Sequence, residues 1–430
     1  DYQEIKIQEA ASKIGVGSMP RSLLIKLQHD LVDTCQPGDE VVVVGILLAQ
    51  WQQSAQPGIE CNVGMALKAH SARVTQENGA SAFVEGAVGE LDKYKKEFDS
   101  FWDDSRRREY PIASRDFICK AVCPKLYGLQ VIKLSLLLTL IGGVSSSSYE
   151  GNEQANEEDE NVDTNACDPG TGKSQVLRFA SALCPRSVLT TGVGTTSAGL
   201  TCAAVREGDD KEFALEAGAL VLADKGVCLI DEFGCIRKED RTSIHEAMEQ
   251  QTLSVAKAGI VCKLNCRATI VAVMNPRNCI YDNQVSLAQN TGLGTPLLSR
   301  FDLIFKLVDS SDAERDSNVT TYLLNRAIQG TGYDGTSTMT GEEIPWSMEK
   351  LRAYIAIVKD RFRPIISDEA ATLLETHYEK VRSAQSFTIP ITVRFLESLI
   401  RLSQAHARLM YRNTVTLEDA IAVLRIMECS

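Results

Sequence analysis

A short glycine-containing run in the middle of the chain constrains its fold more than any other feature. It reads Asp168-Pro-Gly-Thr-Gly-Lys173-Ser174. Glycines let backbone N–H groups turn toward a phosphate, the lysine then reaches the β- and γ-phosphates, and the serine hydroxyl ligates Mg²⁺. Short glycine-lysine-serine runs also occur by chance, so the run needs support from elsewhere. The candidate nucleotide-binding residues are Asp168, Pro169, Gly170, Thr171, Gly172, Lys173, Ser174 and Gln175.

The residues after this loop predict a helix. Val176, Leu177, Ala180 and Leu183 recur at helical spacing and form one apolar face. The positive N-terminal end of such a helix favours a bound phosphate.

A second motif strengthens the prediction of a nucleotide-binding site. The apolar run Val227–Ile230 is typical of a buried strand, and it ends in Asp231 and Glu232. Asp231 can hold Mg²⁺ through water, and Glu232 can polarise an attacking water. We therefore expect ATP and Mg²⁺ as cofactors, with Ser174 and Asp231 on the metal. Without the upstream loop, a strand ending at a solvated turn would fit equally well.

Three further polar residues follow predicted elements. Asn275 follows the apolar run Thr269–Met274 and could help Glu232 to orient water. Arg300 ends a helix-like stretch and could reach the γ-phosphate of a neighbouring subunit, and Arg394 starts an amphipathic helix and could be a second phosphate sensor. Taken singly, the three also fit a turn, a surface arginine and a cation on a helix surface.

One lysine is a candidate for contact with DNA. The segment Ser254–Val261 predicts a strand–turn–strand hairpin with Lys257 at its tip. The net charge of −12 excludes a wholly basic nucleic-acid coat protein, but it does not exclude basic residues confined to a pore or loop. A cation on an exposed tip is more commonly only solubilising.

The His245-Glu246-Ala-Met-Glu249 run lacks the second histidine of a metalloprotease motif, so no zinc protease is expected. Ile244, Ala247, Met248 and Gln251 define a packing face on the same helix.

The rest of the chain divides by composition. We expect a β-rich barrel over 1–76, followed by a linker with a surface helix and two further helices over 77–144. An acidic disordered stretch over 145–166 comes next. It leads into an α/β core over 167–344, whose last part (311–344) is loop-like, and a helical end over 345–430. The longest apolar stretch, Leu134–Val144, is too short to span a bilayer, so no membrane association is expected.

Taken together, these segments resemble the minichromosome maintenance (MCM) helicases of the AAA+ class. The resemblance extends over nearly the whole chain. It is strongest with the ninth paralogous subfamily, associated with homologous recombination, as a plant-like or divergent member. The segments that carry it are the phosphate loop, Ser187–Thr201, Glu216–Phe233, Arg241–Gly259, Pro296–Phe305 and Thr392–Ile421.

The resemblance implies an α/β AAA+ ATPase core with a helical C-terminal lid, preceded by an OB-like barrel. It implies a nuclear helicase subunit of a hexameric ring, which hydrolyses ATP between subunits and acts on single- or double-stranded DNA in repair or replication. Other MCM subunits, the eighth paralogue foremost, are the expected partners. It assigns Asn275 as first sensor, Arg300 as arginine finger, Arg394 as second sensor and Lys257 as the pore-hairpin lysine.

One segment departs from the family pattern. Family members place an apolar strand and a glycine before the phosphate loop, whereas here Glu150–Asp168 carries eight acidic residues and no Lys or Arg. Such composition predicts disorder and loss of a central strand. Its sharp boundaries suggest an aberrant splice or a mistaken gene assembly.

Two alternatives to an active helicase subunit stay open. The lost strand favours a catalytically impaired DNA-binding ring subunit, and a chelatase-type AAA+ machine is the other enzyme class. The first residue is Asp1, so we expect the chain to be a fragment that lacks its N-terminus.

Overall fold

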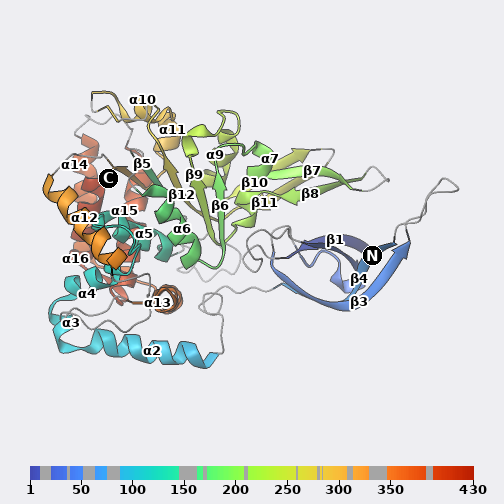
Figure 1. Cartoon of the computed structure of the whole chain (residues 1–430), viewed down its shortest axis with the longest axis horizontal. Helices are drawn as coiled ribbons and strands as arrows, with labels where there is room; N and C mark the ends of the chain where they lie inside the picture. Colours follow the sequence, from blue (N-terminus) through green and yellow to red (C-terminus); the bar gives the residue numbers. More distant parts are fainter. Residues whose placement is uncertain are drawn as a thin grey trace.

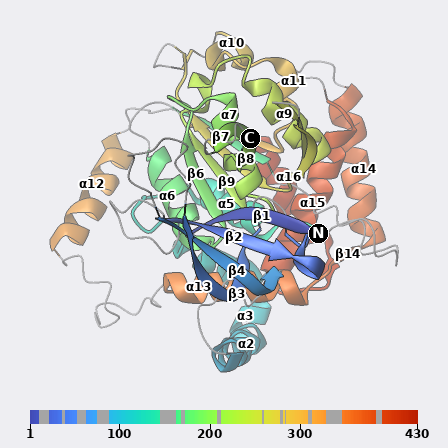
Figure 2. The same ribbon diagram turned by 90° about the vertical axis from the view of Figure 1, so that its right-hand side faces the viewer.

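The computed structural model describes most of the chain as an N-terminal sheet, an α/β core and a helical C-terminal part (Figure 1). Figure 2 views the molecule from the side of the N-terminal sheet. The described residues are 1–9, 21–35, 39–51, 63–74, 88–144, 162–167, 172–207, 212–257, 260–277, 281–282, 284–307, 313–328, 346–383 and 391–430.

The N-terminal sheet has the strand order β1-β2-β4-β3. Its strands are β1 (Tyr2–Gln8), β2 (Ser22–Gln28), β3 (Val41–Trp51) and β4 (Val63–Val74). Pairing is antiparallel within β1–β2 and β3–β4 and parallel between β2 and β4. Ile25 and Leu27 are fully buried and form the centre of a small core. The predicted β-rich character of this region is confirmed.

The core sheet is parallel throughout, in the order β13-β5-β12-β9-β6. Its strands are β5 (Val162–Cys167), β6 (Ser187–Thr191), β9 (Val227–Asp231), β12 (Thr269–Met274) and β13 (Leu303–Leu307). The two apolar runs predicted as strands, Val227–Ile230 and Thr269–Met274, are therefore confirmed as β9 and β12.

Both faces of this sheet are covered, which explains why β9 and β12 consist almost entirely of apolar residues. Along β9, Val227 and Leu229 join one buried cluster, whereas Cys228 and Ile230 join the other. Side chains alternate between the faces of a strand, so a strand between two apolar layers needs apolar residues at every position.

The predicted loss of the strand before the phosphate loop is wrong. Val162–Cys167, the end of the acidic stretch, forms β5 in the middle of the sheet, where it pairs with β12 and β13. Backbone groups supply these hydrogen bonds, so a polar sequence can fill the position between two apolar strands. The predicted disorder therefore does not extend to 162–166, and residues 145–161 lie outside the described residues.

Helices pack on both sides of the core sheet (Figure 1). The predicted apolar face of α6 (Lys173–Leu183) is confirmed, because Val176, Leu177, Ala180 and Leu183 are all buried. The other core helices are α7 (Ser197–Leu200), α8 (Ala219–Leu222), α9 (Arg241–Gln250), α10 (Leu287–Thr291), α11 (Thr295–Leu298) and α12 (Ala313–Ile328). Helix α12 corrects the expected loop over 313–328, whereas 311–312 and 329–344 lie outside the described residues. The apolar residues Val319, Leu323 and Leu324 of α12 recur at helical spacing.

Two hairpins extend the core. Strands β10 (Thr252–Lys257) and β11 (Ile260–Asn265) pair antiparallel, which confirms the predicted hairpin. A second hairpin, β7 (Cys202–Glu207) with β8 (Glu212–Ala217), was not predicted.

The C-terminal part is helical, as predicted. It contains α13 (Met348–Arg361), α14 (Asp368–Ser383), α15 (Val393–Leu409) and α16 (Leu417–Cys429), with the short pair β14 (Ile365–Ile366) and β15 (Thr414–Val415). A capping box formed by Thr416 and Asp419 begins α16.

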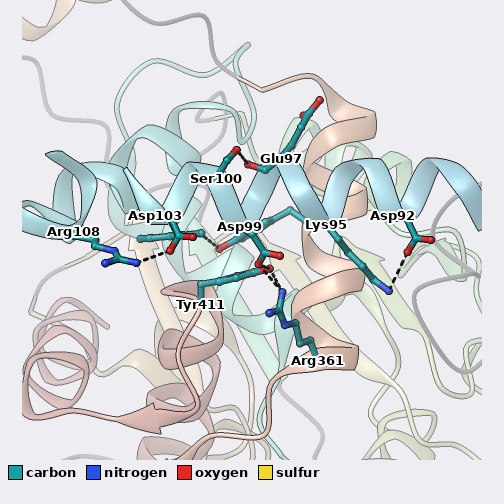
Figure 3. Close-up of polar contacts among 11 residues, drawn as sticks. Asp92, Lys95, Glu97, Asp99, Ser100, Asp103, Arg108, Arg361 and Tyr411 are labelled. Carbon is teal, nitrogen blue, oxygen red and sulfur yellow. Dashed lines mark hydrogen bonds and ion pairs between the residues drawn. The ribbon is translucent and has the colours of Figure 1, made fainter. Parts of the chain in front are cut away.

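The helices before the core pack against this C-terminal part. They are α2 (Val88–Asp103), α3 (Ser105–Glu109), α4 (Pro111–Lys120) and α5 (Gln130–Ile141). Helix α2 is more than the expected surface helix, because Phe98 is fully buried and Asp99 accepts hydrogen bonds from Tyr411 and Arg361 at 2.8 and 2.6 Å (Figure 3). Among the described helices, none is long and apolar enough to cross a membrane.

Candidate active site

Four of the predicted catalytic residues, Lys173, Asp231, Glu232 and Asn275, lie together near the carboxyl ends of two neighbouring strands. Asp231 ends β9, and Asn275 follows β12, which pairs with β9 in parallel. The start of α6 faces them across a cavity of about 350 Å³. The residues that line this cavity are Gly172, Lys173, Ser174, Gln175, Asp231, Glu232, Met274 and Asn275.

Ser174 and Asp231 are in direct contact. The Ser174 hydroxyl donates a hydrogen bond of 2.8 Å to Oδ2 of Asp231, and Oδ1 of Asp231 accepts the Glu232 backbone N–H at 2.9 Å. A hydroxyl and a carboxylate at this separation are the oxygen donors that Mg²⁺ prefers. The predicted metal pair therefore fits Mg²⁺.

Glu232 begins a sharp turn at the mouth of the cavity. Its φ of 53° lies in the left-handed region, and its side chain is exposed. Gly192 packs against this turn so closely that a Cβ there would overlap the Glu232 carbonyl oxygen, and the Gly192 N–H donates to the Asp231 carbonyl at 2.6 Å. The backbone of Gly192 therefore fixes the direction in which Glu232 leaves β9.

Arg241, at the start of α9, holds the other side of this turn. Its guanidinium donates to the carbonyl oxygens of Gly234, Ile236 and Gly292 at 2.8, 3.0 and 3.2 Å. Burial lowers the pKa of Arg241. Neither Gly192 nor Arg241 was predicted from the sequence as a site residue.

Only part of the phosphate loop can be compared with the prediction. Asp168–Thr171 lie outside the described residues, so their predicted role stays a prediction. Gly172 has a φ of 86°, and a Cβ there would overlap the Leu126 side chain. Glycine is the residue that adopts this conformation without strain.

The two candidate arginines do not line the cavity. They come from different parts of the chain and lie together on Glu249, near the end of α9. Arg300 donates to Glu249 Oε2 at 2.5 Å, and the Arg394 guanidinium lies 3.6 Å from Oε1. These hydrogen bonds and charges lower the pKa of Glu249, with the Arg300 hydrogen bond as the main cause.

His245 also contacts Arg300. Its Nδ1 lies 3.1 Å from the Arg300 guanidinium, which can only donate, so Nδ1 accepts and the imidazole is neutral. Burial lowers the pKa of His245, and the charge of Arg300 adds to this effect. From the sequence, α9 was interpreted only as a packing helix. The four-residue spacing of His245 and Glu249 indicates that both lie on one shared face of this helix.

Lys257 ends β10, and two residues separate it from the start of β11. Its position at the hairpin end agrees with the prediction, and its contact with DNA stays a prediction.

Three protein-family models match this chain, and they correspond to the N-terminal sheet, the α/β core and the helical C-terminal part of the structure. Residues 109–327 match the MCM P-loop domain, 349–430 the MCM AAA-lid domain and 1–50 the MCM OB domain. The chain belongs to the MCM family. The expected fold, an AAA+ core with a helical lid and an OB-type N-terminal part, is confirmed for this MCM chain.

Named relatives resemble this MCM chain along its whole length. A "Probable DNA helicase MCM9" of Oryza sativa subsp. japonica is 45% identical over 431 residues, which are 100% of this chain and 61% of the relative. The protein of the same name from Arabidopsis thaliana is 44% identical over 433 residues, covering 100% and 64%. The "Minichromosome maintenance protein MCM" of Saccharolobus solfataricus is 39% identical over 431 residues, covering 99% and 59%. The chain thus spans about three fifths of the length of these curated relatives.

Proposed function

We propose that this chain is an ATP-hydrolysing subunit of an MCM ring that acts on DNA as a helicase. Each active site would contain the cavity residues of one subunit and the arginines of its neighbour. Mg²⁺ would be held by Ser174 and Asp231, and its charge would stabilise the transferring phosphoryl group.

The observation that supports this proposal most is the arrangement of the cavity. Lys173, Ser174, Asp231, Glu232 and Asn275 all line it, although they come from three separate segments. We infer that Lys173 would meet the phosphates, that Glu232 would orient and polarise the attacking water, and that Asn275 would assist Glu232.

The positions of the arginines support a shared site. Neither Arg300 nor Arg394 lines the cavity of its own chain, and both lie on Glu249. A phosphoryl-transfer site gains a large rate factor from an arginine supplied in trans. Hydrolysis would then depend on assembly, because only a neighbouring subunit would bring these cations to the phosphate.

The remaining parts of the proposal concern DNA and cellular role. Lys257 would contact the DNA backbone from the β10–β11 hairpin inside the ring. The relatives named as probable DNA helicases support action on DNA. We propose a nuclear role in homologous recombination repair, with the eighth paralogue as partner and replication as the other setting.

Nucleotide binding and turnover test this proposal in two steps. Binding of a fluorescent ATP analogue with Mg²⁺ should be lost in Lys173→Ala. In the assembled full-length protein, Glu232→Gln should bind ATP and fail to hydrolyse it. Binding that does not depend on Lys173, or turnover that survives Glu232→Gln, would overturn the assignment.

A catalytically impaired DNA-binding subunit is the second candidate. The observation that favours it is the sequence of β5, which places Asp163, Thr164 and Asn165 in an interior strand of the sheet, between β13 and β12. Polar residues are unfavourable in a strand between two apolar layers, and β5 leads directly into the phosphate loop. DNA binding with no turnover by the wild-type assembly would support this candidate.

A further inference from the structure

One carboxylate brings together two arginines that are far apart in the sequence. Arg300 follows α11 in the core, whereas Arg394 lies in the first turn of the lid helix α15. The two oxygens of Glu249 divide the contacts: Oε2 accepts from Arg300 at 2.5 Å, and Oε1 lies 3.6 Å from Arg394. Glu249 is therefore an ionic link between core and lid.

This arrangement has electrostatic costs. Two guanidinium groups near each other repel, and a carboxylate in the last turn of a helix is unfavourable beside the negative end of the helix dipole. The negative charge of Glu249 between the two arginines offsets their repulsion. The positive charges of the arginines offset the unfavourable interaction of the Glu249 carboxylate with the dipole of α9.

The link is also exposed. The Glu249 side chain is 51% accessible, against 34% for Arg394 and 18% for Arg300. Exposed ion pairs contribute little to stability. Positioning is therefore a better explanation of the cluster than stability is.

The Arg300 side chain is held on more than one side. It also donates to the Pro296 carbonyl at 2.6 Å and contacts His245 Nδ1 at 3.1 Å. A guanidinium carries five donors, so these contacts leave further capacity for an anion.

We propose that Glu249 is a positioning residue for hydrolysis between subunits. Its carboxylate holds Arg300 and Arg394 side by side, so that core and lid present both cations to the neighbour's phosphates as one unit. The inference rests on the proposed function, because it requires a shared active site.

Glu249→Gln tests the inference, since it keeps the shape of the side chain and removes its charge. In the assembled full-length protein, we expect nucleotide affinity to stay within about twofold and kcat to fall roughly tenfold, as expected for misplaced catalytic groups. Glu239→Gln is the matched control, because Glu239 is exposed and lies just before the same helix. It should leave kcat unchanged.

A double-mutant cycle separates positioning from a general structural role. If Glu249 acts through the arginines, Glu249→Gln should cost much less in an Arg394→Gln background than in the wild type. Equal losses in both backgrounds would overturn the inference. Glu249→Asp, which keeps the charge on a shorter stem, should be intermediate in kcat, and it replaces Glu249→Gln if that variant does not fold.

The same assay distinguishes the two possible failures. No Lys173-dependent turnover by the wild type would overturn the proposed function. Lys173-dependent turnover that Glu249→Gln leaves at the wild-type level would overturn only the role of Glu249.

Discussion

The ring of Phe233 lies edge-on against the ring of Phe301, with centroids 5.8 Å apart and planes at 86°. Phe233 directly follows the candidate catalytic Glu232, and Phe301 directly follows Arg300. This buried contact therefore connects two candidate site residues. Glu232 is proposed to orient water in the site of its own chain, and Arg300 is proposed to serve the site of the neighbouring subunit. A shift on one side is expected to reach the other, because close-packed interiors transmit strain.

Phe301→Leu tests this contact. The substitution keeps an apolar side chain but loses the edge-to-face pairing, so the free energy of unfolding should fall by about 1–2 kcal/mol. Urea unfolding of the variant measures the loss, and kcat of the assembled protein should fall with it. Unchanged stability and kcat would mean that the ring contact has no such role.

Gly172→Ala tests the start of the phosphate-loop helix. A Cβ at a φ of 86° is strained and would overlap Leu126. We expect a loss of about 1–3 kcal/mol in unfolding free energy and weaker nucleotide binding. Adding Leu126→Ala should restore only part of the nucleotide affinity, since it removes the overlap and leaves the backbone strain. Wild-type affinity in the single variant would contradict this account.

The pH dependence of stability should contain a contribution from His245. Its pKa in the folded chain is lowered, chiefly by burial and further by Arg300, from the usual value of 6.5. The folded state therefore binds this proton less readily than the unfolded chain does. The stabilising contribution is present above about pH 6.5 and declines as the pH falls below it toward the lowered pKa.

His245→Gln removes this titration. Unfolding measured between pH 7.5 and 5 should show a shallower decline in stability for the variant than for the wild type. Parallel declines over this range would show that His245 does not contribute.

The polar sequence of β5 should limit the stability of the core. Asp163 and Asn165 are two residues apart in the strand and so share one face of it. We expect Asp163→Val with Asn165→Val to raise the unfolding free energy by about 1–3 kcal/mol. Urea unfolding measures the gain, and Gln8→Val at an exposed position in the N-terminal sheet is a control outside the core. A decrease in stability would show that the polar residues are suited to this position.

The sequence predicted the elements whose residues carry their own pattern. Strands β9 and β12 consist almost entirely of apolar residues, and the α6 face follows helical spacing, so local reasoning was sufficient. Strand β5 was missed because its residues do not favour a buried strand. Its place between β12 and β13 is set by backbone pairing with two neighbours distant in sequence.

The residues of the candidate site also divide into those that a local pattern predicted and those that it did not. Ser174, Asp231, Glu232 and Asn275 lie at the ends of recognisable elements, and the structure gathers them at one cavity. The contribution of α9 was missed, because Glu249 becomes informative only when Arg300 and Arg394 fold onto it from the core and the lid. No local pattern in the sequence reports such a contact.

Mixing two inactive variants tests the central claim most directly, namely that each active site is shared by two subunits. Lys173→Ala disables the cavity of its own chain, and Arg300→Ala disables the arginine offered to the neighbour. Each variant alone should hydrolyse little ATP. Mixed before assembly, they should regain part of the wild-type activity, because some interfaces then pair an intact cavity with an intact Arg300. No recovery from mixtures that demonstrably co-assemble, with wild-type turnover measured in parallel, would contradict a shared site.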